Sequence, residues 1–546
     1  MPRRLPFLLL LGLLVCAPSA QATSPTGRLV VRLADSGAHS KTHAAALVAR
    51  AGGRLASGRV PALGLVTVRP ARGGSLTELE TGLRRVPGVL RIEREHRGAP
   101  RALPNDPALG SQEPAAGAPQ DTPLQWWASR QNLPAAWDVR QTHRATVAII
   151  DTGVDASHPE LAARIVGGDD NDPTPGAGPE SVDEEGHGTH VASLACATPN
   201  NGIGIAGAAY GCRLLVYKSD FSDASIAESI VEATDAGADA INMSFGTTAG
   251  EVAPQAVRDA VEYAHDRGVI LVAAAADEPT DGQGYPADLL QPTGTGADPA
   301  KGLGLSVTAA NFVDRRASFA GFGSQISMAA YGAWNTGSGG PRGLLGAFPA
   351  ADVALERAVG GARPCNCRTV VGGDRRFAYV QGTSMAAPMV TGVAAMVRRL
   401  NPDLSADEVI AVLKQTARRE PGSGWAPDLG WGILDAGAAV AAARTLDRRA
   451  PATKLRVSKR RGRTLNLRIV GVDRAPSGVQ RSGIASYEVY RRIDGGKATR
   501  IARTERRRVR LRLSTGRRYT FWSVATDVAG NRERSPKRPD VTLKTR

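Results

Sequence analysis

The middle of the chain alternates short apolar segments with segments of helical periodicity, and this repeat constrains the fold more than any other feature. Four apolar runs are typical of buried strands: 145–150, 213–218, 240–244 and 269–274. Helical patterns at 224–236 and 254–267 lie between them. Strand–helix–strand repeats produce parallel strands with helices on both faces of the sheet. We therefore predict an α/β fold built on a doubly wound, mostly parallel sheet.

Different patterns flank this section. On its N-terminal side, strands and helices alternate on a smaller scale, with strands expected at 29–33, 63–68 and 89–93 and helices at 43–51 and 76–85. They predict a small β-α-β-β-α-β unit. On its C-terminal side, the runs 465–469 and 509–513 alternate apolar and polar residues, and 519–525 is a further strand. They predict an all-β sandwich of the immunoglobulin or fibronectin III kind.

Residues 1–22 have the pattern of an export signal. Arg3 and Arg4 precede the apolar run 8–15, and Ala20-Gln21-Ala22 offers small residues for cleavage. The apolar run is too short to span a bilayer. A lipid anchor on Cys16 is the alternative. We expect a secreted or cell-envelope-associated protein.

These patterns divide the chain into five parts. The expected boundaries are a signal peptide at 1–22, an α/β unit at 23–100, a linker at 101–123, the main α/β domain at 124–446 and the sandwich at 451–546. Pro, Gly, Ala and Gln dominate the linker, and this composition is typical of exposed, easily cut chain.

The net charge of +16 is not spread evenly along the chain. Residues 451–546 contain 27 Lys and Arg against 7 Asp and Glu, a net of +20, so the remainder carries −4. Many of these cations would coat a solvated sheet face, and they would also suit binding to anionic cell-envelope polymers. Sequence-specific nucleic-acid binding is not expected, because the chain has an export signal and no motif for such binding.

Four cysteines remain once Cys16 leaves with the signal: Cys196, Cys212, Cys365 and Cys367. An oxidising compartment allows three ways of pairing them into two disulfides. Their spacing does not match the usual zinc patterns. We expect a Cys196–Cys212 disulfide and a tight Cys365–Cys367 link.

Three short segments carry residues suited to nucleophilic catalysis. Asp151-Thr152-Gly153 ends the first apolar run, His187-Gly188-Thr189-His190 opens a helical stretch, and Gly382-Thr383-Ser384 precedes another. A serine hydroxyl is a poor nucleophile unless a base and an orienting carboxylate lie within reach. A serine at a helix N-terminus also has backbone N–H groups available for an oxyanion. Taken singly, each residue equally suits a helix cap, a turn or an ordinary polar site.

These motifs, in the order Asp, His, Ser, closely resemble those of the subtilase family over residues 126–443. By that resemblance, Asp151 orients the base, His187 is the base and Ser384 attacks the peptide carbonyl. The likeness implies a monomeric serine endopeptidase that needs no cofactor for its chemistry and cleaves proteins or peptides through an acyl-enzyme. It also implies that residues 23–100 are a propeptide that is removed by self-cleavage and inhibits the enzyme.

The same likeness assigns substrate contacts. Residues 242–246 resemble the family's edge segment, which pairs with an extended peptide through backbone hydrogen bonds. Residues 273–276 resemble the wall of the pocket for the residue before the cleaved bond. The expected contact residues are Ser244, Phe245, Gly246, Ala274, Ala275 and Ala276. Both segments also suit ordinary core strands.

One position departs from the family pattern. Where the family normally has Gly-Asn, with the Asn side chain donating to the oxyanion, this chain has Ala276-Asp277. An ionised Asp277 would repel the developing charge, a loss of roughly 3–4 kcal/mol. Either Asp277 is protonated and donates, or the Ser384 backbone N–H acts alone in a slower enzyme, or the protease is disabled. We expect a working but atypical enzyme; the alternative is a subtilase-like binding protein attached to the cell surface by its basic sandwich.

The loop at 199–205 resembles the family loop that wraps a structural Ca²⁺. Its expected ligands are Glu160, Pro199, Asn201, Ile203 and Ile205, which would supply the oxygen atoms that a hard cation prefers. The dipeptide Asn201-Gly202 equally suits an ordinary turn.

Overall fold

The computed structural model describes residues 24–34, 41–60, 64–71, 74–97, 103–139, 145–334, 339–359, 367–476 and 479–546. The expected signal peptide lies outside these residues. The described residues up to 97 form one compact unit, and those from 103 onward form a second. No described helix combines the length and the apolar character that crossing a bilayer requires.

The first unit is a four-stranded antiparallel sheet with α2 and α3 packed against it. Its elements are β1 (Ser24–Leu33), α2 (Lys41–Arg50), β2 (Gly53–Val60), β3 (Leu65–Pro70), α3 (Leu76–Leu83) and β4 (Val89–Arg97), with the strands in the order β2-β3-β1-β4. Leu29, Val31, Val68 and Leu79 are buried in its core. The predicted β-α-β-β-α-β unit is confirmed.

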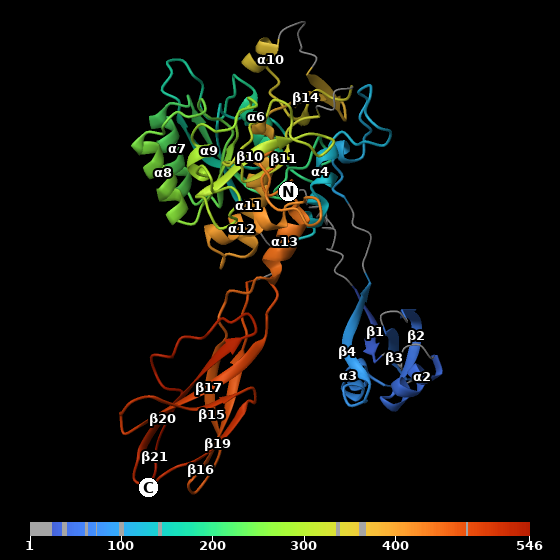
Figure 1. Cartoon of the computed structure of the whole chain (residues 1–546), viewed down its shortest axis with the longest axis vertical. Coiled ribbons are helices and arrows are strands. Elements are labelled where there is room, and N and C mark those ends of the chain that lie inside the picture. Colours follow the sequence, from blue (N-terminus) through green and yellow to red (C-terminus); the bar gives the residue numbers. More distant parts are fainter. Residues whose placement is uncertain are drawn as a thin grey trace, which may run out of the picture. The chain divides into compact units, whose positions relative to one another are not determined.

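A seven-stranded sheet forms the centre of the main α/β domain, the part of the second unit that precedes the C-terminal strands (Figure 1). Its strands are β5 (Thr146–Asp151), β6 (Ile165–Asn171), β7 (Arg213–Ser219), β8 (Ala240–Met243), β9 (Ile270–Ala274), β10 (Gly304–Ala310) and β11 (Met328–Tyr331). Neighbouring strands are parallel throughout, in the order β11-β10-β9-β8-β5-β7-β6. The predicted parallel sheet is confirmed.

Alternate residues of β5 enter cores on opposite faces of this sheet. Val147 and Ile149 pack in one core with α6 (His187–Cys196) and α11 (Thr383–Leu400). Ala148 and Ile150 pack in the other with α7 (Asp223–Asp235) and α8 (Gln255–Asp266). Because both faces are covered, β5 is apolar from Val147 until it ends at Asp151.

Shorter elements complete this part of the chain. They are the 3-10 turn η2 (Pro107–Leu109), α4 (Trp126–Arg130), α5 (Leu133–Trp137), α9 (Ala287–Leu290), α10 (Ala354–Val359), α12 (Ala406–Thr416), α13 (Ala436–Thr445) and the small antiparallel sheet of β12 (Leu344–Ala347), β14 (Asp374–Val380) and β13 (Arg368–Val371).

Residues 103–123 contact the main domain at several points, so the prediction of an exposed linker is wrong for those residues, while others such as Gly110, Ser111 and Gln112 are exposed as expected. Ala108 is fully buried, and Asp106 is 2% exposed. The Asp106 carboxylate accepts the Asn200 N–H at 2.7 Å, and the Ala108 N–H donates to the Gly204 carbonyl at 2.9 Å. Composition could not reveal these contacts because the partners lie almost a hundred positions away in the sequence.

The C-terminal region consists of two antiparallel sheets. One contains β15 (Ala452–Arg461), β16 (Thr464–Val472) and β19 (Arg508–Arg512), and the other contains β18 (Thr499–Thr504), β17 (Ile484–Ile493), β20 (Arg518–Asp527) and β21 (Val541–Lys544). Leu465, Leu467 and Ile469 of the first sheet share a core with Val489 and Phe521 of the second. The predicted all-β sandwich is confirmed.

Candidate active site

The candidate segments follow the carboxyl ends of adjacent parallel strands, where sheets of this type place their sites. Asp151 is the last residue of β5. Ser244 follows β8, and residues 275–278 follow β9; these two strands come next in the sheet. The topology therefore brings segments far apart in sequence to one edge.

Asp151 and His187 form a direct pair at this edge. His187 is the first residue of α6, and its Nδ1 lies 2.7 Å from Asp151 Oδ1. Asp151 is 1% exposed, and its Oδ1 also accepts the Thr152 N–H at 2.8 Å. Because Nδ1 faces the carboxylate, Nε2 is the nitrogen that remains for proton transfer.

A further carboxylate, which the sequence analysis did not single out, joins these two elements. Asp183 is buried and accepts hydrogen bonds from the Thr152 hydroxyl, 2.9 Å, and from the N–H and hydroxyl of Thr189, 2.8 and 2.6 Å. Thr152 follows β5, and Thr189 lies in the first turn of α6. Asp183 thus holds the start of α6 against the end of β5. An acidic residue shortly before a helix start was the available signal.

The carboxylates around His187 favour its charged form. Burial alone would lower the pKa of His187, but the charge and hydrogen bond of Asp151, followed by the charges of Asp183 and Asp277, raise it to about 9. A base must be neutral to accept a proton, so a base at this position would first have to lose the proton that these carboxylates favour.

Ser384 lies in the first turn of α11 and is tied to the segment after β8. Its Oγ donates to the Ser244 carbonyl at 2.9 Å, and the Ser244 hydroxyl donates to the Ser384 carbonyl at 2.8 Å. Within the described residues, no hydrogen bond joins Ser384 Oγ to His187. Contacts between a nucleophile and its base commonly tighten only when substrate binds.

Asp277 contacts the start of the same helix. Its Oδ1 accepts both the N–H and the hydroxyl of Thr383, at 2.7 and 2.8 Å. Its Oδ2 lies beside Gly382, where an added Cβ would come within 2.9 Å of it. The Asp277 carboxylate therefore ties the segment after β9 to the start of α11.

Two cavities share Phe245 as a lining residue. The smaller, about 400 Å³, is also lined by Asp277 and Ser384, and the larger, about 670 Å³, by His187 and Ser244. Each residue expected to contact substrate lines at least one of them: Ser244, Phe245, Gly246, Ala274, Ala275 and Ala276. Both cavities together offer room for an extended peptide beside the three candidate triad residues.

The expected calcium loop lies against Glu160. Glu160 Oε1 accepts the Ile205 N–H at 2.9 Å, Oε2 accepts from Asn201 Nδ2 at 3.0 Å, and Asn201 Oδ1 accepts the Ile203 N–H at 2.8 Å. Burial raises the pKa of Glu160 to about 8, and the nearby charge of Asp106 adds to the effect. In the described part of the chain, the Pro199 carbonyl accepts no hydrogen bond.

These contacts suit a bound cation only in part. Two close, buried carboxylates are the donor chemistry that Ca²⁺ prefers, and Asp106 is a candidate ligand that sequence reasoning missed. However, the loop presents N–H groups of Asn201 and Ile205 to Glu160 in this arrangement. Holding the ion would therefore require the Asn201 amide to turn its oxygen inward.

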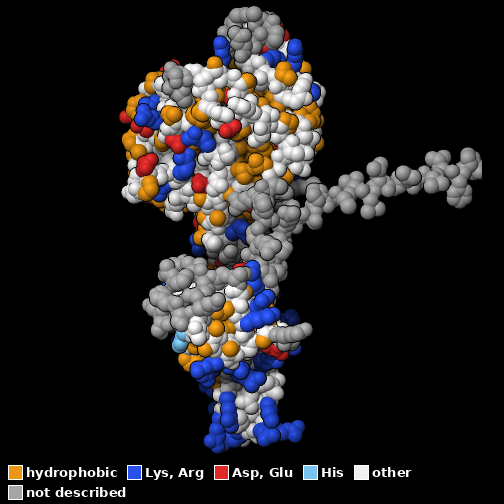
Figure 2. All heavy atoms as spheres, turned by 90° about the vertical axis from the view of Figure 1, so that its right-hand side faces the viewer, with side chains coloured by type: hydrophobic (Ala, Val, Ile, Leu, Met, Phe, Trp, Pro, Cys, Tyr) orange, Lys and Arg blue, Asp and Glu red, His pale blue; other side chains and the backbone are white. Residues whose placement is uncertain are grey.

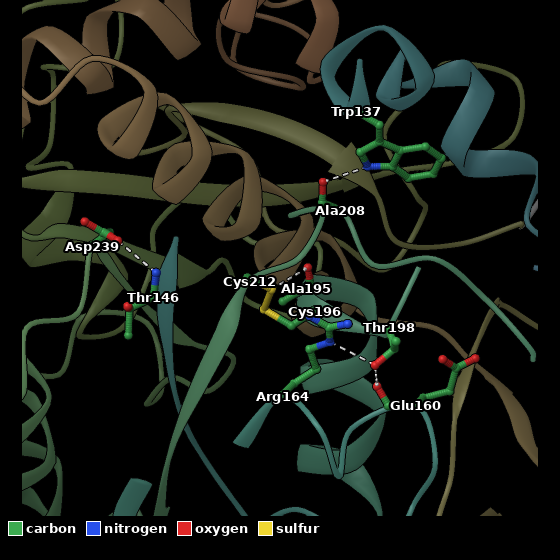
Figure 3. Close-up of a disulfide and its surroundings, with 10 residues drawn as sticks. All are labelled: Trp137, Thr146, Glu160, Arg164, Ala195, Cys196, Thr198, Ala208, Cys212 and Asp239. Atoms are coloured by element: carbon green, nitrogen blue, oxygen red, sulfur yellow. Dashed lines mark hydrogen bonds between the residues drawn. A yellow bond between two sulfur atoms is a disulfide. The ribbon is translucent and has the colours of Figure 1, made fainter. Parts of the chain in front are cut away.

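A disulfide fastens the far end of the helix that begins at His187. Cys196, the last residue of α6, is bonded to Cys212, which directly precedes β7 (Figure 3). This predicted pairing is present. Cys367 is also disulfide-bonded, and its expected partner Cys365 lies outside the described residues.

Comparisons with known proteins give a consistent picture. The model of the subtilase family matches residues 142–432. Thermitase from Thermoactinomyces vulgaris is 30% identical over 333 residues, which cover 59% of this chain and 95% of that protein. An extracellular protease from Xanthomonas campestris pv. campestris is 30% identical over 449 residues, covering 74% of this chain and 69% of that protein. Among solved structures, a protease from Pseudoalteromonas arctica is 28% identical, with a TM-score of 0.48, and covers 63% of this chain and all of that one.

Proposed function

The chain belongs to the subtilase family of serine proteases, and from that premise we propose that it is a secreted endopeptidase in which Asp151, His187 and Ser384 form the catalytic triad. The observation that carries the proposal is the 2.7 Å contact of Asp151 and His187, together with the two cavities that His187 and Ser384 line and that share Phe245. One relative in the comparison is named an extracellular protease, which supports both the activity and the secretion.

In the proposed reaction, Ser384 Oγ attacks the carbonyl carbon of a bound peptide while His187 Nε2 takes the hydroxyl proton. The C–N bond breaks as His187 passes that proton to the leaving amine, which leaves an ester on Ser384. Water then repeats the sequence and releases the acid. Asp151 stabilises the imidazolium. The Ser384 backbone N–H donates a hydrogen bond to the oxyanion, and the Asp277 side chain lies beside it.

A fluorophosphonate probe tests this assignment directly. Because the reagent reacts with activated serines, we expect mature protein to be labelled once, on Ser384, and Ser384→Ala to remain unlabelled. Mass spectrometry of the labelled peptide gives the readout. Stoichiometric protein without any label would contradict the proposal and favour a protein that only binds.

We further propose that the first compact unit is a propeptide that inhibits the enzyme until the chain cuts itself. The described residues up to 97 form a compact unit of their own, which supports this division. Secretion as a monomer, with the two disulfides formed on export, completes the proposal.

We also propose a structural Ca²⁺ held by Glu160, Asp106 and the 199–205 loop. Without the ion, Glu160 keeps a proton in the folded chain between its ordinary pKa of 4.5 and about 8, so stability should fall as pH rises through that window. Added Ca²⁺ should therefore raise the melting temperature by several degrees at pH 9, and less at pH 5. Thermal melts in EGTA and in calcium measure this difference.

Glu160→Gln removes the charge at nearly constant shape and should abolish most of the calcium effect, whereas Glu228→Gln, at an exposed position, should keep it. A wild-type melting temperature that is the same in EGTA and in calcium at both pH values would rule the site out.

A further inference from the structure

The sandwich has a groove on the sheet that contains β17 and β20. Its volume is about 720 Å³, and its lining includes Tyr490, Trp522, Arg492, Arg518 and Lys537. The rings of Tyr490 and Trp522 stack with centroids 5.6 Å apart and planes 9° apart. The Arg492 guanidinium lies 5.4 Å from the Trp522 ring. An apolar floor and a basic rim thus occur together.

The groove offers hydrogen-bond donors and positive charge, with little to balance them. In the described part of the chain, the Arg492, Arg518 and Lys537 side chains form no ion pair. The lining carboxylate, Asp494, is already engaged, because it accepts from the Arg517 side chain at 2.8 Å and from the Arg518 N–H at 2.7 Å. Trp522 is 8% exposed, and its Nε1–H is buried without an acceptor. A donor-rich groove of this kind suits a ligand rich in anionic acceptors.

The sandwich has a second basic cavity. It measures about 300 Å³ and is lined by Arg460, Arg463, Lys544, Thr545 and Arg546. Thr545 accepts the Arg517 N–H at 3.0 Å, and Arg517 is the residue paired with Asp494 of the first groove. At the lower end of Figure 2, Lys and Arg predominate among the coloured side chains of the sandwich. Two basic hollows on one sandwich fit a repeating polyanion better than a single small ion.

We infer that this groove binds an acidic polysaccharide, with a sugar ring beside the half-buried Tyr490 and carboxylate or sulfate groups on Arg492, Arg518 and Lys537. A polysaccharide combines apolar ring faces with regularly spaced anions, which matches the floor and the rim of the groove. Polyphosphate has the anions without the rings. The inference names the ligand chemistry and the site for the anionic polymers that the charge of residues 451–546 led us to expect, and it does not depend on catalysis.

The test uses full-length protein and measures binding to immobilised alginate, a polyuronate, with dextran as the neutral reference. Alginate should bind and dextran should not. The triple variant Arg492→Ala, Arg518→Ala, Lys537→Ala should weaken alginate binding at least tenfold, because three groove cations are lost. A control triple variant, Lys459→Ala, Arg468→Ala, Arg508→Ala, removes the same charge from exposed positions on the other sheet and should change binding less than twofold.

Several results would overturn the inference. They are absence of alginate binding, equal weakening by both triple variants, and binding of polyphosphate or DNA that matches alginate. Circular dichroism and peptide hydrolysis are measured on every variant. Unchanged hydrolysis with lost alginate binding separates this site from the protease, and absent hydrolysis with intact alginate binding counts against the proposed function alone.

Discussion

The Ser384→Ala variant is expected to remain a full-length precursor without peptidase activity. The substitution removes the nucleophile, and loss of a triad nucleophile typically lowers turnover by about 10⁶-fold. Wild type should mature through a cut on the N-terminal side of Asp106, since Asp106 and Ala108 are buried parts of the second unit. Gel electrophoresis and N-terminal sequencing of the mature chain measure both expectations.

The matched control is Ser423→Ala, which changes an exposed serine far from the two cavities and should mature normally. Adding a trace of mature wild type to the Ser384→Ala precursor distinguishes cutting within one molecule from cutting between molecules. Self-maturation of pure Ser384→Ala at the wild-type rate would contradict the triad assignment.

The Asp277→Asn variant is expected to gain activity at neutral pH for two reasons. An Asn side chain can donate to the oxyanion from the position of Oδ2, and one such donor is worth about 10²–10³-fold in rate. Removing the Asp277 charge also removes one of the influences that raise the pKa of His187 to about 9. With a pKa of 9, only about 1% of His187 is neutral at pH 7.

The pH profile of kcat/KM separates these two effects. In wild type, the rate should rise with pH until His187 is deprotonated near pH 9, because only neutral imidazole accepts the Ser384 proton. In Asp277→Asn, this acidic limb should move to lower pH and the plateau should be higher. Glu278→Gln is the matched control: Glu278 lines the same cavity but is not among the groups that raise the pKa of His187.

An Asp277→Asn variant with the wild-type plateau and the wild-type acidic limb would show that Asp277 does not face the reacting atoms.

The fold followed from the sequence because its signals are local. Period-two and period-3.6 patterns depend on neighbours within a few residues, and β5, β7, α7 and α8 begin and end within one or two residues of the expected positions. The motif around Ser384 was recognisable for the same reason. The buried parts of 103–123 were not predicted, because the composition of this stretch is typical of exposed chain. The contacts that hold it depend on partners far away in the sequence, such as Asn200.

The sequence alone determined a doubly wound parallel sheet, a small α/β unit, a basic sandwich and three motifs of one protease family. Only the tertiary structure decided that Asp183 links the end of β5 to the start of α6. It also decided that Asp277 contacts Thr383, 106 positions away in the sequence, through one of its oxygens. The physical reason is that a carboxylate acts through whatever lies within about 4–6 Å. Such neighbours are set by the packing of distant segments, which no local pattern encodes.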